Sequence, residues 1–155
     1  MSKMMIYSGI GSRSTPKEIG NLMTLLATKL DLLGYTLRSG HATGSDTYFE
    51  NGVISNKKEI YLAKDATTES IEYASKFHDK WSSCKDYVKC LHGRNVKIIL
   101  GKDLKSPSDF VICWTEDETN GGTSLGLKIA KYNQIPIFNL ANEEHKERLL
   151  KFINT

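Results

Sequence analysis

Three glycine-containing loops, each directly after an apolar segment, are the parts of the sequence best suited to bind a ligand. They span residues 9–13, 40–46 and 121–124. Each leads towards a predicted helix, whose free N-terminal N–H groups and partial positive charge suit a phosphate. Glycine also lets the backbone approach a ligand without a Cβ atom in the way. Together, the three loops predict a site for an anion or a nucleotide.

Side chains in and beside these loops could complete the site. Arg13 has a planar guanidinium fork that suits phosphate. Trp114 could stack on a base or belong to the core, and Asn95 could orient a ribose or cap a helix. We expect the ligand-binding residues to be Gly9, Gly11, Ser12, Arg13, Ser39, Gly40, Asp46, Arg94, Asn95, Trp114, Gly121, Gly122, Thr123 and Ser124.

Carboxylates near the loops suggest hydrolysis of an N-glycosidic bond. That reaction needs a carboxylate beside the anomeric carbon, to stabilise an oxocarbenium-like transition state or to activate water. Asp46 and Glu50 are spaced i, i+4 and share one helix face. Glu50 is the preferred catalytic residue, and Glu116, in an acidic run after a predicted strand, is the second candidate. Both Asp46 and Glu50 could instead only complement the positive end of a helix.

Several common site types do not match the sequence. It contains no Gly-x4-Gly-Lys-Ser/Thr motif, which argues against a P-loop nucleotide triphosphatase. The first loop lacks the third glycine of a dinucleotide-binding fingerprint, which argues against an ordinary NAD-dependent dehydrogenase. Cys84, Cys90 and His92, with His78 as a fourth ligand, match no common zinc spacing. We therefore expect no metal and no cofactor.

The composition describes a single domain over residues 1–155, with 39% apolar and 25% charged residues. A net charge of +3 favours a small anionic ligand over duplex DNA, whose binders usually carry a denser basic stripe. No apolar run reaches the roughly 20 residues of a membrane-spanning helix. Three cysteines without a framework spacing favour a reducing compartment. We expect a cytoplasmic location and no membrane partner.

Predicted strands must position the three loops. They cover residues 4–8, 35–39, 59–62, 110–114 and 135–139. Strands that alternate with helices predict right-handed crossovers and a parallel sheet covered on both faces. The expected fold is α/β, a Rossmann-like three-layer α/β/α sandwich with a mainly parallel five-stranded sheet. Ligands of such folds bind at the carboxyl ends of the strands, where the loops lie.

Helix boundaries follow from capping signals and apolar spacing. Thr15 suits an N-cap, Pro16 the first helical position and Glu18 the acid of a capping box. In the middle of the chain we expect one helix over residues 83–91. Residues 96–100 fit a strand by their composition, but Asn95 before them and Gly101 after them suit helix caps, so we prefer a second helix there. Arg94 and Asn95 would then lie between two helices and could reach over the site.

The loop motifs also carry a resemblance to a known family. They read Ser8-Gly9-Ile10-Gly11-Ser12-Arg13-x-Thr15-Pro16, Leu37-Arg38-Ser39-Gly40-x-Ala42-x-Gly44-x-Asp46-x-x-Phe49-Glu50, Gly93-Arg94-Asn95, Asp109-Phe110-Val111-Ile112-Cys113-Trp114-Thr115, Gly121-Gly122-Thr123 and Ile135-Pro136-Ile137-Phe138-Asn139-Leu140. This set resembles the SLOG superfamily and, more narrowly, the small DprA-like Rossmann proteins of bacteriophages. A phage origin would place the protein in the host cytoplasm.

The resemblance implies several activities. LOG-type members cleave the N-glycosidic bond of nucleoside monophosphates, DprA proteins bind single-stranded DNA and load a recombinase, and other members sense signalling nucleotides. LOG enzymes carry Pro-Gly-Gly-x-Gly-Thr and a catalytic glutamate downstream. The corresponding segment here, residues 120–126, lacks the middle glycine and that acid. Related small Rossmann proteins commonly self-associate, so the resemblance also implies a homo-oligomer.

Three functions follow, in order of preference. The first is hydrolysis of the N-glycosidic bond of a nucleoside monophosphate or related nucleotide. The second is non-catalytic binding, as a sensor or sponge for a signalling nucleotide in a phage–host conflict. The third is DprA-like binding of single-stranded DNA, which requires a basic groove with stacking aromatic residues.

Overall fold

A computed structural model describes residues 5–154 of the chain. The expected start of the first strand at Met4 lies outside these residues. The elements in chain order are β1 (Ile6–Gly11), α1 (Lys17–Leu32), β2 (Thr36–Ser39), α2 (Ser45–Gly52), β3 (Lys58–Ile60), η1 (Ala63–Asp65), α3 (Thr68–Ser75), η2 (Trp81–Ser83), α4 (Asp86–Leu100), β4 (Phe110–Trp114), α5 (Gly122–Tyr132), β5 (Ile137–Asn139) and α6 (Glu143–Ile153).

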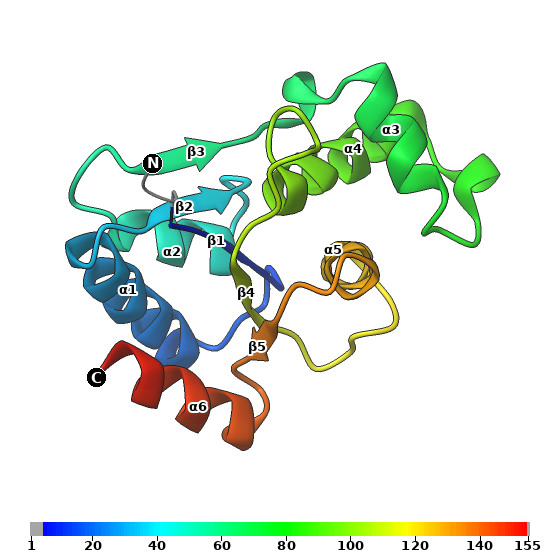
Figure 1. Cartoon of the computed structure of the whole chain (residues 1–155). Helices are drawn as coiled ribbons and strands as arrows, with labels where there is room; N and C mark the ends of the chain where they lie inside the picture. The colour runs from blue at the N-terminus through cyan, green and yellow to red at the C-terminus, as the bar shows by residue number, and fades with distance from the viewer. Residues whose placement is uncertain (1–4, 155) are drawn as a thin grey trace.

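The five strands form one parallel sheet in the order β3-β2-β1-β4-β5. The chain therefore moves outward from β1 to one edge and then crosses back to β4 (Figure 1). This reversal makes β1 and β4 neighbours at the topological switch point, where such sheets bind ligands. The predicted α/β class and parallel five-stranded sheet are confirmed.

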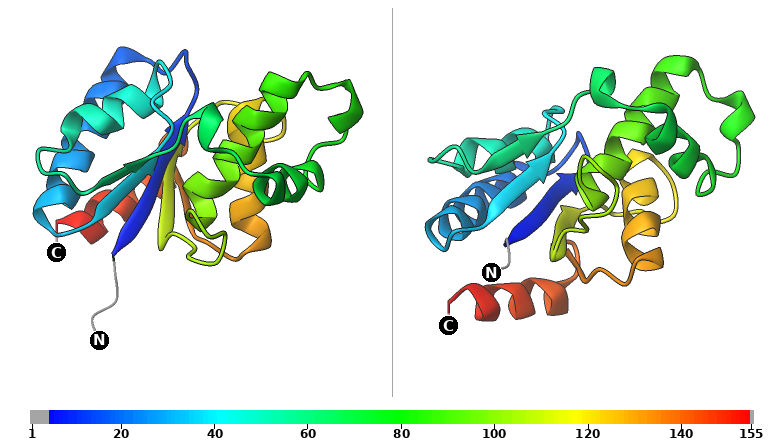
Figure 2. Two further views of the ribbon diagram at one scale, coloured as in Figure 1. Left: turned by 90° about the horizontal axis from the view of Figure 1, so that it is seen from above. Right: turned by 45° about the horizontal axis from the view of Figure 1, so that its top comes forward.

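Helices cover both faces of the sheet. On one face, α1, α2 and α6 pack around Met23, Leu26, Phe49, Ile112 and Leu149. On the other face, α4 and α5 contribute to a core that also contains side chains of β1, β4 and α3. Figure 2 shows the segment between α3 and α4 projecting beyond the body formed by α4 and α5. The two apolar cores on opposite sides of one sheet make the three layers.

Helix α4 is longer than the sequence signals predict. It runs without a break from Asp86 to Leu100, so the expectation of two helices is wrong. Asn95 therefore does not cap a second helix, because its backbone lies inside the continuous helix. The run from Val96 to Leu100 is buried almost completely, Lys97 included, which explains why its other four residues are apolar.

Helix α1 begins differently from the predicted capping box. Pro16 occupies the N-cap position, and no side chain caps the helix. The hydroxyl of Thr15 instead donates to the carbonyl oxygen of Ser12, at 2.7 Å, and lies 2.6 Å from the hydroxyl of Ser45. Thr15 therefore holds the first glycine loop against the start of α2. Helix α6 does have a side-chain cap, because the Asn142 side chain accepts from the amide of His145.

Over residues 5–154, no helix is long and apolar enough to cross a membrane.

Candidate functional site

A cavity of about 660 Å³ lies at the carboxyl ends of β1 and β4. The first glycine loop forms one wall, the start of α5 a second, and α4 with residues 77–80 a third. Binding cavities for small molecules measure about 300–1,000 Å³, so this cavity has room for a nucleotide. Its position is the one that the strand order predicts for a ligand of this fold.

The start of α5 opens into this cavity. Gly121 holds the N-cap position with no side-chain cap, so the first amides of the helix have no side-chain partner there. A Cβ atom built on Gly121 or Gly122 meets nothing within 4 Å. Lys128, two turns further along α5, also lines the cavity. Free amides, the helix dipole and a lysine together favour a bound anion.

The first glycine loop brings Arg13 to the opposite wall. The amide of Ser12 donates to the carbonyl oxygen of Trp114, at 3.1 Å, which ties the loop to the end of β4. The second loop passes so close that a Cβ atom on Gly44 would lie 2.5 Å from the Ser12 carbonyl oxygen. Gly44 also has φ +89°, which favours glycine. This tight packing positions Arg13 on the cavity wall.

A polar cluster of buried Asp46 and Arg94 with half-buried Asn95 lines the cavity between these walls. Nη1 of Arg94 donates to the carbonyl oxygens of Gly40, at 2.8 Å, and Tyr61, at 3.1 Å, and its Nε donates to Asn95 Oδ1. The cluster is therefore held by the backbone of the second loop. It can offer hydrogen bonds to a sugar or a base.

Burial changes the protonation of this cluster. It raises the pKa of Asp46 to about 6, although hydrogen bonds from the backbone of Ala42 and the charge of Arg94 oppose the shift. Burial likewise lowers the pKa of Arg94, and Asp46 opposes that change. Buried acids with raised pKa values occur at functional sites more often than elsewhere.

Most of the predicted ligand-binding residues line the cavity. They are Gly11, Ser12, Arg13, Asp46, Arg94, Asn95, Gly121, Gly122, Thr123 and Ser124. The hydroxyl of Ser124 donates to the Gly121 carbonyl oxygen at 2.6 Å, so it also supports the start of α5.

Four other predicted contacts lie behind the lining. Gly9 packs on Phe49, and the Ser39 hydroxyl donates to the Gly9 carbonyl oxygen at 2.7 Å. Trp114 packs in the core on the α1 side of the sheet. The carbonyl oxygen of Gly40 is occupied by Arg94. These residues shape the sheet edge from behind instead of lining the cavity.

The two predicted catalytic glutamates do not line the cavity. Glu50 lies 2.6 Å from Nδ1 of His41 and 3.1 Å from Nζ of Lys58. Partial burial raises the pKa of Glu50, but the hydrogen bonds from His41 and Lys58 outweigh it and the net shift is downward. Glu116 is exposed on the loop after β4. The carboxylates that do line the cavity belong to Asp46 and Asp79.

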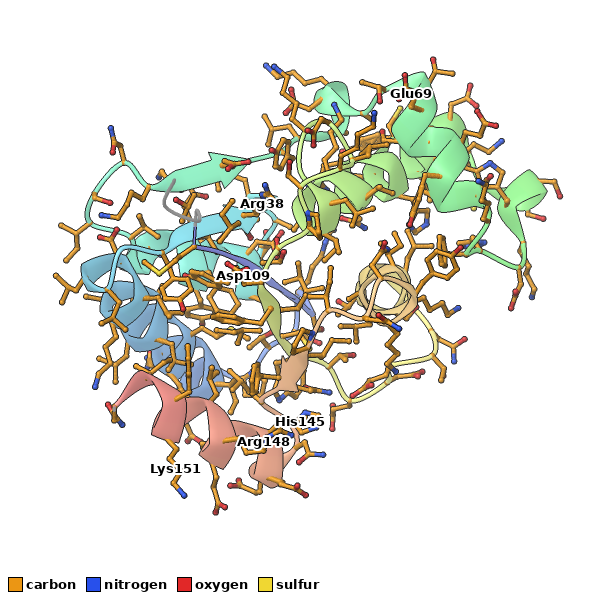
Figure 3. All side chains as sticks on the ribbon, in the orientation of Figure 1. Arg38, Glu69, Asp109, His145, Arg148 and Lys151 are labelled. Atoms are coloured by element: carbon orange, nitrogen blue, oxygen red, sulfur yellow. The ribbon has the colours of Figure 1, made fainter. Side chains whose placement is uncertain are left out.

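Basic residues of other elements lie away from this site. Arg38 is buried beside Glu59 and donates to the carbonyl oxygen of Ser106, so it holds the loop before β4. Figure 3 shows Arg38 over the sheet, and Arg148 and Lys151 on α6, across the sheet from α4 and α5. The lysines and arginines that line the cavity are instead Arg13, Lys80, Arg94 and Lys128.

Sequence reasoning missed the wall built from α4 and the turn before it. Val88, Leu91, His92 and Ile99 lie at helical spacing from the predicted Asn95 and line the cavity with it. This periodicity would have identified them if the helix had been predicted as continuous. Phe77 and His78 follow α3 and line the same wall, and no local sequence signal indicates that.

Comparison with known proteins gives one informative match. No protein-family model and no curated protein matches the chain. A solved structure of DNA processing protein A from Helicobacter pylori, reported for its unique single-stranded DNA binding mode, has 18% sequence identity and a TM-score of 0.64. The match covers 97% of this chain and 79% of that one. This chain therefore has a DprA-like fold.

Proposed function

We propose that the chain binds the phosphate of a nucleotide in the cavity at the carboxyl edge of the sheet. The observation that carries the proposal is the uncapped start of α5, which opens into a cavity of about 660 Å³. Arg13 and Lys128 line the same cavity. A phosphate at this point would accept hydrogen bonds from backbone amides and compensate the positive charge.

The polar cluster supports a nucleotide over inorganic phosphate. Asp46 and Asn95 are hydrogen-bonding groups on the wall beside the phosphate site, and they suit ribose hydroxyls or a base edge. Phe77 and Leu91 add apolar surface to the same cavity. Ligand cavities typically combine an apolar lining with a few polar groups that orient the ligand.

Single-stranded DNA is the second candidate, and the structural neighbour favours it. The protein from Helicobacter pylori is described as binding single-stranded DNA, and it shares this fold. Lys80 and Lys128 at the cavity would contact further phosphates of a strand. The neighbour supports DNA binding more than hydrolysis. Hydrolysis would also need Asp46 as its carboxylate, since Glu50 and Glu116 do not line the cavity.

Fluorescence anisotropy with a labelled oligodeoxythymidine tests the proposal. The probe carries a 5′-phosphate in one series and a 5′-hydroxyl in another, and nucleoside monophosphates and inorganic phosphate serve as competitors. Full competition by a mononucleotide supports a nucleotide site, and tighter binding with increasing strand length supports DNA as the natural ligand. Mass spectrometry of the same mixtures detects any free base, and its release would show that the protein hydrolyses the N-glycosidic bond.

A matched pair of variants locates the site. We expect Arg13→Ala to weaken binding about tenfold or more, the value of one charge-assisted hydrogen bond. Arg148→Ala, on α6 across the sheet, should leave affinity unchanged. Equal affinities of both variants, or no competition by any mononucleotide, would refute the proposed site.

Self-association also stays a prediction. Helix α1 and its C-cap residue expose three apolar side chains, Leu25, Leu32 and Leu33. Light scattering of the purified protein would reveal a homo-oligomer.

A further inference from the structure

Three potential metal ligands converge in the segment that joins α3 to α4. His78 follows α3, Cys84 follows the short helix η2 and His92 lies in the second turn of α4. One ligand atom of each residue lies within 4.8 Å of the other two. We propose that these three side chains bind one Zn²⁺ ion at the wall of the cavity. The proposal does not depend on nucleotide binding.

The spacing of the ligand atoms is close to that of a tetrahedral zinc site. Zn–S and Zn–N bonds of about 2.3 and 2.0 Å set sulfur and nitrogen about 3.6 Å apart. Sγ of Cys84 lies 3.7 Å from Nε2 of His78. Bringing all three ligand atoms to bonding distance of one ion requires a movement of about 1 Å, and His78 and Cys84 lie outside the helices, in the connecting segment. Cysteine sulfur and histidine nitrogen are both ordinary zinc ligands.

His92 provides an independent indication of a missing partner. Its side chain is 7% exposed, and its Nδ1 has no hydrogen-bond partner among the described residues. A buried polar atom without a partner costs about 1–3 kcal/mol. A bound metal ion is a partner that a ring nitrogen of histidine can take.

The metal-free hydrogen bonds of His78 are consistent with this role. Nδ1 of His78 accepts from the amide of Lys80 at 3.0 Å, so the ring proton sits on Nε2, towards Cys84. Zn²⁺ would displace the thiol proton of Cys84, which is released to solvent. The ring proton of His78 would move from Nε2 to Nδ1, so that Nε2 binds the metal, and the amide of Lys80, an exposed residue, would donate to water instead.

An aromatic shell holds the two histidine rings. The centroid of Trp81 lies 6.0 Å from that of His78 and 5.9 Å from that of His92. Such an apolar shell restricts ring motion and water access, and both tune a metal site. Cys90, two residues before His92 on α4, is not in the cluster. Tertiary folding therefore selects one of the two nearby cysteines.

The site would also face the cavity. His78 and His92 both line it, and three protein ligands leave a fourth tetrahedral position for water or an oxygen of a bound ligand. This open position is the feature that distinguishes reactive zinc sites from closed structural ones. Zn²⁺ here would add positive charge beside Arg94 and Asn95.

Cobalt titration of the full chain, first freed of metal with a chelator, tests the proposal. Co²⁺ occupies zinc sites and reports thiolate ligation through charge-transfer absorption. We expect one equivalent to bind with a thiolate band and tetrahedral visible bands, and Zn²⁺ to displace it, as its stronger binding to such ligands predicts. Absence of the thiolate band, or binding of Co²⁺ in octahedral form only, would overturn the proposal.

Variants and chemical protection complete the test. Cys84→Ala and His92→Asn should each weaken Co²⁺ binding at least about tenfold, since even outer-sphere partners of a metal contribute that much. Cys90→Ala is the matched control and should bind normally. Unchanged affinity of Cys84→Ala would overturn the site. If a variant fails to fold, alkylation of the unmodified protein provides the test. Zn²⁺ should protect Cys84 from alkylation and leave Cys90 reactive. Equal alkylation of both cysteines in the presence of Zn²⁺ would overturn the proposal.

Discussion

Nη1 of Arg94 lies 2.8 Å from the carbonyl oxygen of Gly40, so a side chain in the middle of α4 holds the loop that follows β2. The same nitrogen reaches the carbonyl oxygen of Tyr61, beyond β3. Both acceptors are backbone groups that water cannot easily reach once Arg94 is in place. One guanidinium thus joins helix α4 to the ends of two strands and forms part of the cavity wall.

Arg94→Met should therefore destabilise the fold. Removing the guanidinium leaves two carbonyl oxygens without their donor and Asp46 without its nearest positive charge, which costs about 3 kcal/mol in all. Urea denaturation followed by circular dichroism measures the change. Arg13→Ala is the control, because Arg13 is exposed and should change the free energy of unfolding by less than about 0.5 kcal/mol. Similar midpoints for both variants would contradict this role of Arg94.

Stability should depend on pH through Asp46. Its pKa is raised from 3.8 to about 6 in the folded state, so between these values the folded chain binds more protons than the unfolded chain. Stability contributed by this group is thus present at low pH and is lost as pH rises through about 6, by about 2–3 kcal/mol.

The measurement is the difference between the unmodified protein and Asp46→Asn across that pH range. The difference cancels carboxylates such as Asp31, whose lowered pKa gives the opposite slope. We expect Asp46→Asn to be the more stable protein at pH 7 and to lose that advantage near pH 4. A difference that does not vary with pH would show that Asp46 is ionised at its ordinary pKa.

Two glycines of the loops should respond differently to substitution by alanine, because only one of them lies in a close backbone contact. Gly44→Ala should destabilise the protein by about 2 kcal/mol or more, because φ is +89° and the new Cβ would meet the backbone of Ser12 and Arg13. Gly122→Ala meets open space, so thermal unfolding should show little loss of stability. If Gly44→Ala unfolds at the same temperature as Gly122→Ala, the close contact of the two loops does not exist in solution.

Glu50 should matter little for binding. Its carboxylate is paired with His41 and Lys58 and does not line the cavity. Glu50→Gln should change nucleotide affinity less than twofold in the anisotropy assay. Glu50→Gln should also lose less stability than the unmodified protein as pH falls. The reason is that a carboxylate with a lowered pKa stabilises the fold only while it is ionised. Loss of measurable base release in this variant would return Glu50 to the catalytic role.

Salt dependence should report the number of phosphate contacts. If Arg13, Lys80 and Lys128 each contact one phosphate of a single strand, the logarithm of affinity should fall against that of salt with a slope of about −2. A mononucleotide, which carries one phosphate, should give a shallower slope, between zero and about −1. Slopes that are equal for strand and mononucleotide would argue for a site limited to one nucleotide.

The sequence alone determined the sheet and the three loops, since apolar strands, glycines and helix starts are local signals. It also predicted that Arg13 and residues 121–124 lie at the same edge of the sheet, because parallel strands end there, and both line the cavity.

Only the tertiary structure decided which side chains enter the cavity. Asp46 and Glu50 share a helix, yet packing against the second loop buries Asp46 and leaves Glu50 beside His41. The wall that contains His78 and His92 depends on α4 continuing past Arg94 and on α3 packing against it. Contacts of that kind join residues far apart in the chain, so spacing in the sequence carries no information about them.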